Sequence, residues 1–119
     1  MQSFRNLKVW DKAHVLALDV YRSSKTFPRD EQYGLTSQMR RASVSVGANI
    51  AEGACRKGDG EFGRFLRIAM GSASELEYHL LLARDLKLLP APDYERLDKN
   101  AIEVKRMLAA LISKLKADS

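Results

Sequence analysis

The sequence has little of what constrains small secreted or membrane-bound proteins. It contains a single cysteine, Cys55, so no disulfide can form within the chain. No apolar stretch approaches the roughly 18 residues that a membrane-spanning helix requires. Residues Met1 to Val9 contain neither an apolar run nor a small-residue cleavage site, so we expect no signal peptide. These absences predict a cytoplasmic protein with no membrane partner.

Proline is also scarce, and its positions divide the chain. Breaks occur at Phe27–Asp30, Gly58–Gly60 and Pro90–Pro92. Proline lacks the amide proton that a helix interior needs, and glycine is favoured at helix ends. The breaks leave four segments, at about residues 7–25, 31–56, 61–88 and 93–116.

Each segment carries apolar residues at helical spacing. The first has Val9, Ala13, Leu16 and Val20, which recur every three or four positions. The other three segments repeat this pattern, and no segment alternates as a strand does. Four helices joined by short connections pack as antiparallel neighbours. We therefore predict an all-α, antiparallel, up-down-up-down four-helix bundle that forms one domain over residues 1–119, with Asp30 capping the second helix.

The first helix has a second apolar stripe beside the first. This stripe consists of Trp10, His14, Ala17 and Tyr21. A wide apolar face is explained either by deeper burial within one subunit or by burial against another copy. We favour the second explanation, and we predict that these residues form the interface of a homo-oligomer.

Several polar residues lie on or beside the predicted apolar seams. They are Arg41, Asn49 and Glu52 on the second helix and Glu75 on the third. Buried polar groups are costly unless they bond to one another. We therefore predict a structural cluster of these four residues that fixes helix register. The alternative is a binding or catalytic pair formed by Glu52 and Glu75.

Positive charge is concentrated in the first half of the chain. The net charge is +5, and residues 1–58 hold ten Lys or Arg against five Asp or Glu. Arg56 and Lys57 end the second helix, and Arg64 and Arg67 begin the third. These four residues and Arg40 are candidates for contacts with nucleic-acid phosphates. The alternative explanation is structural, because Lys and Arg at a helix C-terminus interact favourably with the helix dipole.

Motifs for catalysis or metal binding are missing. His14 and His79 are isolated, so a zinc site is not expected, and the sequence contains no phosphate-binding loop. Residues 58–63 match GxGxxG, but a predicted helix rather than a strand precedes them. We expect no catalytic residue, cofactor, metal or small-molecule substrate.

The pattern as a whole resembles the four helix bundle protein family, also called the 23S rRNA-intervening-sequence protein family. The similarity covers nearly the whole chain. Its most specific parts are Asn49-Ile50-Ala51-Glu52-Gly53 and the run from Gly71-Ser72 to Glu75-Leu76-Glu77. Leu7-Lys8-Val9-Trp10 and Tyr33-Gly34-Leu35 add to it.

The resemblance implies a homopentameric barrel of four-helix bundles. Some members of that family are encoded within intervening sequences of bacterial large-subunit ribosomal RNA genes. A related group serves as the accessory protein of diversity-generating retroelements. The resemblance therefore favours a non-enzymatic accessory protein that binds RNA or DNA. A protein-interaction scaffold without nucleic-acid binding is the second hypothesis, and an enzyme that uses Glu52 and Glu75 is the third.

Overall fold

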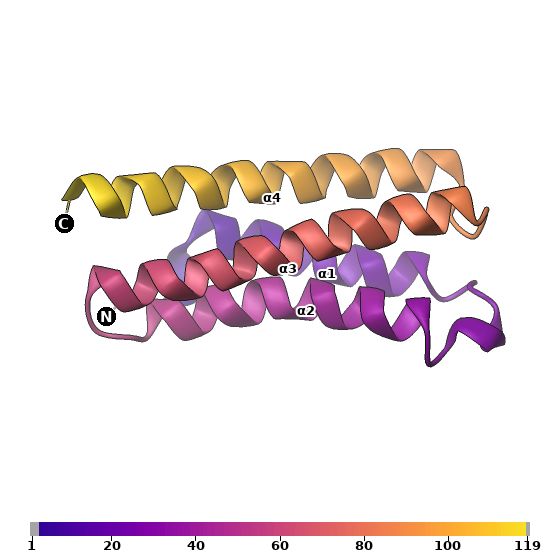
Figure 1. Cartoon of the computed structure of the whole chain (residues 1–119), viewed down its shortest axis with the longest axis horizontal. Coiled ribbons are helices and arrows are strands. Elements are labelled where there is room, and N and C mark those ends of the chain that lie inside the picture. Colours follow the sequence, from indigo (N-terminus) through magenta and orange to yellow (C-terminus); the bar gives the residue numbers. More distant parts are fainter. Residues whose placement is uncertain (1–2, 119) are drawn as a thin grey trace.

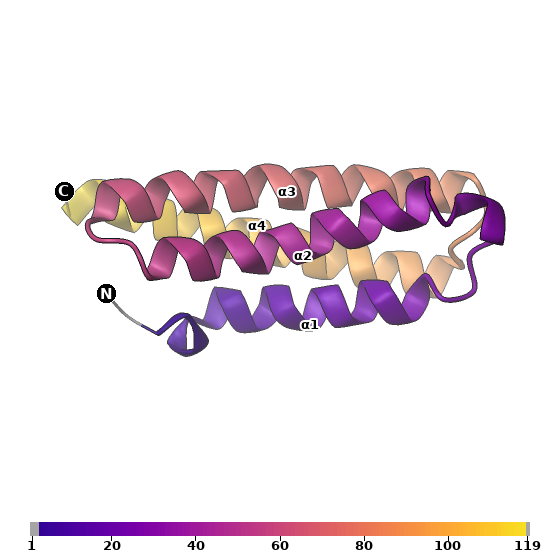
Figure 2. The same cartoon turned by 90° about the horizontal axis from the view of Figure 1, so that it is seen from below.

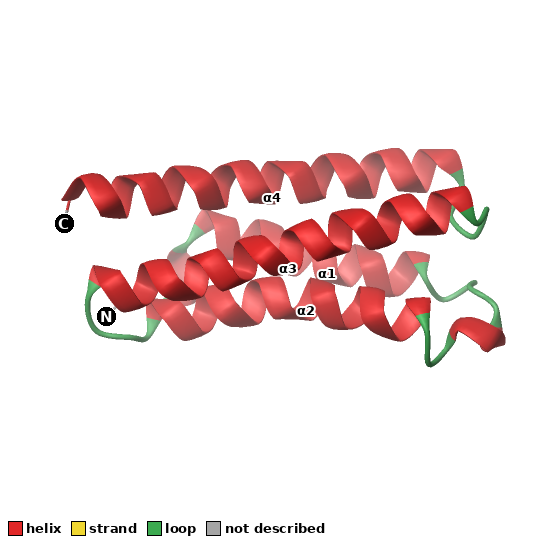
Figure 3. Cartoon of the chain, in the orientation of Figure 1, coloured by secondary structure: helices red, strands yellow, loops and turns green. Residues whose placement is uncertain are grey.

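Four long helices make up most of the molecule (Figure 1, Figure 3). The computed structural model describes residues 3–118. The helices are α1 (Lys8–Ser23), α2 (Leu35–Ala54), α3 (Asp59–Asp85) and α4 (Ala91–Asp118), with short 3-10 turns at Phe4–Asn6 and Arg29–Glu31. The prediction of an all-α protein with four helices is confirmed.

Successive helices run in opposite directions along the long axis of the molecule (Figure 1, Figure 2). Helix α1 packs against α2 and α4, and α3 packs against the same two helices from the far side. The principal extents are 46 × 22 × 19 Å, so the described chain is a rod about two helices wide. None of its helices combines the length and the apolar character needed to cross a membrane.

The predicted apolar stripes form the core. In α1, Val9, Ala13, Leu16 and Val20 are all buried. Each of the other helices contributes a matching row of buried residues, and together these rows form one apolar cluster. Burial of such rows along the whole length of four helices is the main force that holds the bundle together.

The connection between α1 and α2 differs from the prediction. Asp30 was expected to cap the second helix, but it lies in the short 3-10 turn, and α2 begins five residues later at Leu35. The carboxylate of Glu31 accepts a hydrogen bond from the Leu35 amide at 3.1 Å and so caps α2 from outside the helix. Gly34, with φ −109° and ψ −115°, breaks the helical path between the two elements.

The turn between α2 and α3 depends on two glycines. Gly58 has φ 85°, a left-handed conformation that glycine adopts without strain. Gly53 allows α2 and α3 to approach closely, because a Cβ atom there would lie 2.7 Å from Cβ of Phe65 and 3.0 Å from Cδ1 of Phe62. The first contact is shorter than Cβ atoms in proteins make, so a side chain at this position would force its neighbours to move.

We expect Gly53→Ala to destabilise the fold by about 1–3 kcal/mol, because the two helices must move apart to admit the methyl group. The matched control is Gly71→Ala in the middle of α3, where a Cβ atom would meet nothing within 4 Å. That change should stabilise the protein by about 0.5–1 kcal/mol through helix propensity. Urea unfolding at a fixed protein concentration measures both, and equal effects would contradict the packing argument.

An ion pair joins α1 to α4 across the bundle. Asp19 is only 6 % exposed. It accepts hydrogen bonds from Nε of Arg96 at 2.8 Å and from Nη2 of Arg96 at 3.0 Å. The hydrogen bond from Arg96 lowers the pKa of Asp19 despite the opposing effect of burial, and the same bond raises the pKa of Arg96. The two residues are 77 positions apart, and no local sequence pattern predicts their contact.

Replacing Arg96 with glutamine leaves the Asp19 carboxylate buried without its main partner. Since half of the Arg96 side chain is solvated, we expect a modest loss of about 1–2 kcal/mol at pH 7. The depressed pKa means that the pair stabilises the fold above the unfolded pKa of Asp19, near 3.8, and that this contribution disappears as pH falls through the folded pKa. The difference in stability between wild type and variant should therefore be larger at pH 7 than at pH 3. Arg106→Gln, an exposed site on α4, is the control, and an equal loss at both pH values would contradict the assignment.

Candidate functional site

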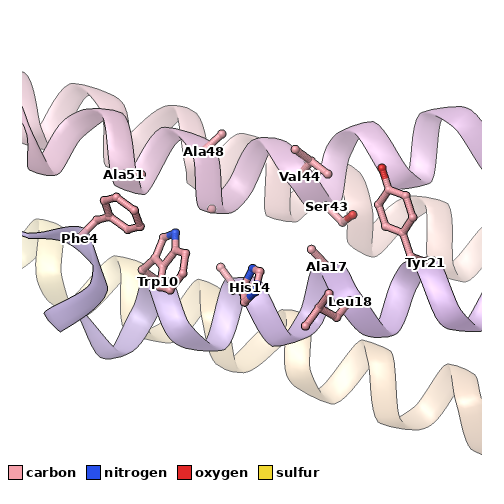
Figure 4. Close-up of a pocket in the computed structure, with 12 residues that line it drawn as sticks. Phe4, Trp10, His14, Ala17, Leu18, Tyr21, Ser43, Val44, Ala48 and Ala51 are labelled. Carbon is pink, nitrogen blue, oxygen red and sulfur yellow. The ribbon is translucent and has the colours of Figure 1, made fainter.

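A long apolar groove lies between α1 and α2. Its volume is about 390 Å³, and side chains from both helices and from the 3-10 turn before α1 line it (Figure 4). Small residues line much of it, because Ala13 and Ala17 on α1 face Gly47, Ala48 and Ala51 on α2. Short side chains on both walls leave space that larger residues would otherwise fill.

Aromatic rings form the α1 wall of the groove. The rings of Trp10 and His14 are stacked, with centroids 5.0 Å apart and planes inclined by only 7°. Phe4 packs its edge against Trp10 with centroids 4.8 Å apart. At the other end, the Arg40 guanidinium lies 4.8 Å from the centre of the Tyr21 ring. The aromatic rings that line the groove therefore pack against neighbouring side chains.

Much of this apolar surface faces solvent. Leu18 is 51 % exposed and Val44 is 47 % exposed, and both line the groove. Tyr21 is 42 % exposed beside them. An exposed and contiguous apolar surface is typical of a site that binds another macromolecule.

All four predicted interface residues lie on this groove. Trp10, His14, Ala17 and Tyr21 line its α1 wall (Figure 4). The stripe beside the buried seam is thus only partly covered within one chain, because Trp10 and Ala17 are half-buried and His14 and Tyr21 are exposed. Burial within one subunit therefore accounts for part of the stripe and leaves His14 and Tyr21 exposed.

The predicted polar cluster does not form. Arg41 is exposed and bonds to none of the other three residues. Glu52 pairs with Arg56 at 3.2 Å, and Glu75 lies 3.4 Å from Nε2 of His79. The prediction was wrong because Arg41, Glu52 and Glu75 point into solvent, which satisfies them separately.

Short polar side chains occupy the α2–α3 seam instead. Nδ2 of Asn49 donates to the Ser45 carbonyl oxygen at 2.9 Å and to Ser45 Oγ at 3.0 Å. The Ser45 and Ser72 hydroxyls are 2.8 Å apart and link the two helices. The seam therefore carries a neutral hydrogen-bond chain and no buried charge cluster.

His79 is the most deeply buried titratable side chain near this seam, at 4 % exposed. Burial lowers its pKa, and the nearby Glu75 carboxylate opposes the shift. Its Nδ1 atom has no hydrogen-bond partner among the described residues. A neutral imidazole in this position serves as a packing residue at neutral pH.

The α2–α3 turn brings two of the candidate basic residues, Arg56 and Arg64, around one aromatic ring. Arg56 lies 5.2 Å and Arg64 lies 4.5 Å from the centre of the Phe65 ring. Arg56 also pairs with Glu52, and Arg64 pairs with Glu61 at 2.9 Å. The hydrogen bond from Arg64 lowers the pKa of Glu61. Lys57, which follows Arg56, is exposed in the turn.

The remaining two candidates lie apart from that ring. Arg67 is exposed one turn further along α3, beside the C-terminal part of α4, where it lines a small cavity with Ile112 and Lys116. Arg40 belongs to the opposite half of the molecule. Its Nε atom donates to Ser24 Oγ at 2.9 Å, and Nη2 donates to the Tyr21 carbonyl oxygen at 3.3 Å. The structure therefore separates Arg40 from the other four basic candidates.

The excess positive charge lies at one end of the bundle. We call this the basic end, and it consists of residues 3–12, 50–67 and 103–118, which the antiparallel fold brings together (Figure 1). It holds eleven Lys or Arg and six Asp or Glu, whereas the rest of the chain holds nine of each. The whole net charge of +5 therefore belongs to this end. The sequence alone places the same excess charge in residues 1–58, but it does not show that this charge gathers at one end of the folded molecule.

Within residues 3–118, no group of three or more His, Cys, Asp or Glu residues is placed to hold a metal ion. Glu52 and Glu75 bond to different partners, and neither lines the groove. The arrangement offers two kinds of contact: an apolar groove along one side and a positively charged end.

Comparisons with known proteins give a consistent result. Residues 5–110 match the model of a family described as 23S rRNA-intervening sequence protein. A solved structure from Bacteroides thetaiotaomicron, described as a protein of unknown function from the S23 ribosomal protein family, is similar over 87 % of this chain and 97 % of its own. Its sequence identity to this chain is 26 % and the TM-score is 0.79. No curated protein matches the chain.

Proposed function

Because the chain belongs to the 23S rRNA-intervening sequence protein family, we propose that it is a non-enzymatic accessory protein that assembles with copies of itself and binds RNA or DNA. The single observation that carries this proposal is the combination, on one rod, of a partly exposed apolar groove and a basic end. The groove serves assembly, and the basic end serves nucleic-acid contact.

Self-association is supported by the chemistry of the groove. Its lining is apolar apart from His14, Ser43 and the Tyr21 hydroxyl, and the Trp10 and His14 rings stack on each other. Interfaces between copies of one chain are typically apolar at their centre and rich in aromatic residues. The resemblance described above implies five copies arranged in a ring.

Nucleic-acid contact is supported by the basic end. Lys8, Lys57, Arg67 and Lys114 are exposed there. Flexible cations of this kind bind phosphates without reading bases. Phe65 also provides an aromatic surface beside two guanidinium groups, a combination that suits stacking on an unpaired base. A ring of copies would present several basic ends to one nucleic acid, and this multiplies weak contacts.

One observation favours the second candidate, a protein-interaction scaffold without nucleic-acid binding. Glu52 and Glu61 already neutralise Arg56 and Arg64. If those pairs persist on binding, fewer cations are left for phosphates, and the groove becomes the main interaction surface.

A salt-titrated binding assay with a structured RNA and with duplex DNA tests the proposal. We expect detectable binding at about 50 mM salt that weakens linearly on a log–log scale as salt rises, because each phosphate contact releases a counterion. No detectable affinity for either probe at about 50 mM salt would refute the nucleic-acid part and leave the scaffold.

A further inference from the structure

A second concavity lies at the end of the bundle opposite the basic end. It is formed where the α1–α2 connection passes the start of α2, and its volume is about 260 Å³. Its described lining combines cationic, hydrogen-bonding and apolar residues: Ser24, Lys25, Phe27, Pro28, Arg29, Gln32, Thr36 and Arg40. We call it the connection pocket.

Cations dominate the polar part of this lining. Lys25, Arg29 and Arg40 contribute three positive charges, and no acidic residue is among the described lining residues. Arg40 is held in place by its bonds to Ser24 Oγ and the Tyr21 carbonyl oxygen. A fixed guanidinium loses little freedom when it binds an anion, which strengthens charge-assisted hydrogen bonds.

A buried hydroxyl in the same wall has no partner. Thr36 is 7 % exposed, and its Oγ1 atom has no hydrogen-bond partner among the described residues. Buried hydroxyls are rarely left unpaired, because desolvation costs free energy that a hydrogen bond normally recovers. An oxyanion in the pocket would give this hydroxyl an acceptor.

Thr36 is also the second residue of α2. The preceding amide, that of Leu35, is bound by Glu31, whereas the amides of Thr36 and Ser37 have no bond among the described residues. Free amides and the helix dipole at a helix start favour negative charge. This feature adds to the three cations and the unpaired hydroxyl, which point independently to an anion.

We propose that the connection pocket binds a phosphate group. Lys25 and Arg29 supply mobile charge, Arg40 supplies a fixed donor, and Thr36 supplies a neutral donor. The site lies far along the rod from the basic end and does not depend on the function proposed above. Its phosphate comes either from free phosphate in solution or from the terminal phosphate of a nucleic-acid strand.

The test uses inorganic phosphate and the full chain, with amide chemical shifts recorded at constant ionic strength against chloride. We expect saturable shifts at residues of the connection pocket. Lys25→Gln combined with Arg29→Gln removes two exposed cations and should raise the Kd at least about tenfold. The matched control, Lys87→Gln with Lys99→Gln, removes the same charge elsewhere at that end and should change the Kd by less than about twofold.

Thr36→Val separates binding from stability. Because the hydroxyl is unpaired, its removal should not lower the unfolding midpoint in chloride, yet it should weaken phosphate binding about fivefold. Phosphate shifts no larger than those in chloride, or equal weakening by the control pair, would overturn the proposal.

Two further probes, a tetranucleotide with and without a 5′-phosphate, identify the source of the group. Tighter binding of the phosphorylated form at the connection pocket than of inorganic phosphate supports a strand end. Equal binding supports free phosphate. If neither inorganic phosphate nor the 5′-phosphorylated tetranucleotide shifts the pocket residues, the proposed site is overturned.

Discussion

Replacing Ala48 with glutamate is expected to convert the proposed assembly into monomers. Ala48 is exposed on α2 and lines the groove, so a glutamate there is accommodated by the isolated chain. In an assembly whose copies cover the groove, the same carboxylate is buried without a partner. Such burial costs several kcal/mol for each interface, so we expect the association constant to fall at least about 100-fold.

Ala110→Glu is the matched control for this experiment. Ala110 is exposed on α4 and lies outside the described groove lining, so the same substitution should leave assembly unchanged. Circular dichroism should show both variants folded, because an exposed Ala to Glu change costs a helix only a few tenths of a kcal/mol. Dissociation by both variants, or by neither, would show that the groove does not carry the interface.

Changing Lys57 and Arg67 to glutamine is expected to weaken RNA and DNA binding broadly. Both residues are exposed, and neither forms an ion pair among the described residues, so the change removes charge from the basic end with little effect on the fold. Loss of two phosphate contacts should reduce the slope of log affinity against log salt concentration for duplex DNA by about two. It should also lower the affinity at about 50 mM salt by about 10–100-fold.

The control for that prediction is the pair Lys87→Gln and Lys99→Gln. It lowers the net charge by the same amount at the opposite end of the rod, so it should have a much smaller effect. A loss confined to one nucleic-acid sequence would contradict contact through phosphates alone. An equal loss in the control pair would show that total charge, and not the basic end, determines affinity.

The helices were predictable because their signal is local. The spacing of Val9, Ala13, Leu16 and Val20 identifies the buried face of α1 without knowledge of its neighbours. The start of α2 was misplaced because the Glu31 side chain, four residues before Leu35, caps the helix. No general residue preference at helix ends predicts such a hydrogen bond. The spacing of apolar residues does not locate a helix boundary that depends on the conformation of one side chain.

The candidate site was only partly predictable, because its contacts join distant parts of the chain. The apolar stripe of Trp10 and Tyr21 was visible in the sequence, but the groove that it lines together with small residues of α2 was not. One helical position turns a side chain by about 100°, so Arg41 and Glu75, each one residue from a buried seam, face solvent.

Long-range polar contacts were the least predictable part. Asp19 and Arg96 are separated by 77 positions, and nothing in their local sequence pairs them. Similarly, Phe65 meets Arg56 only because the turn at Gly58 folds α3 back along α2. The packing of the helices creates these contacts, and the sequence pattern of a single helix does not contain them.

Sedimentation of the unmodified chain at micromolar concentration tests the central claim, that the groove between α1 and α2 is covered by another copy. The chain mass is 13.4 kDa. We predict a species several times that mass, five times if the implied ring forms, which Ala48→Glu reduces to the mass of one chain. A monodisperse species of 13.4 kDa from the unmodified chain would contradict the account.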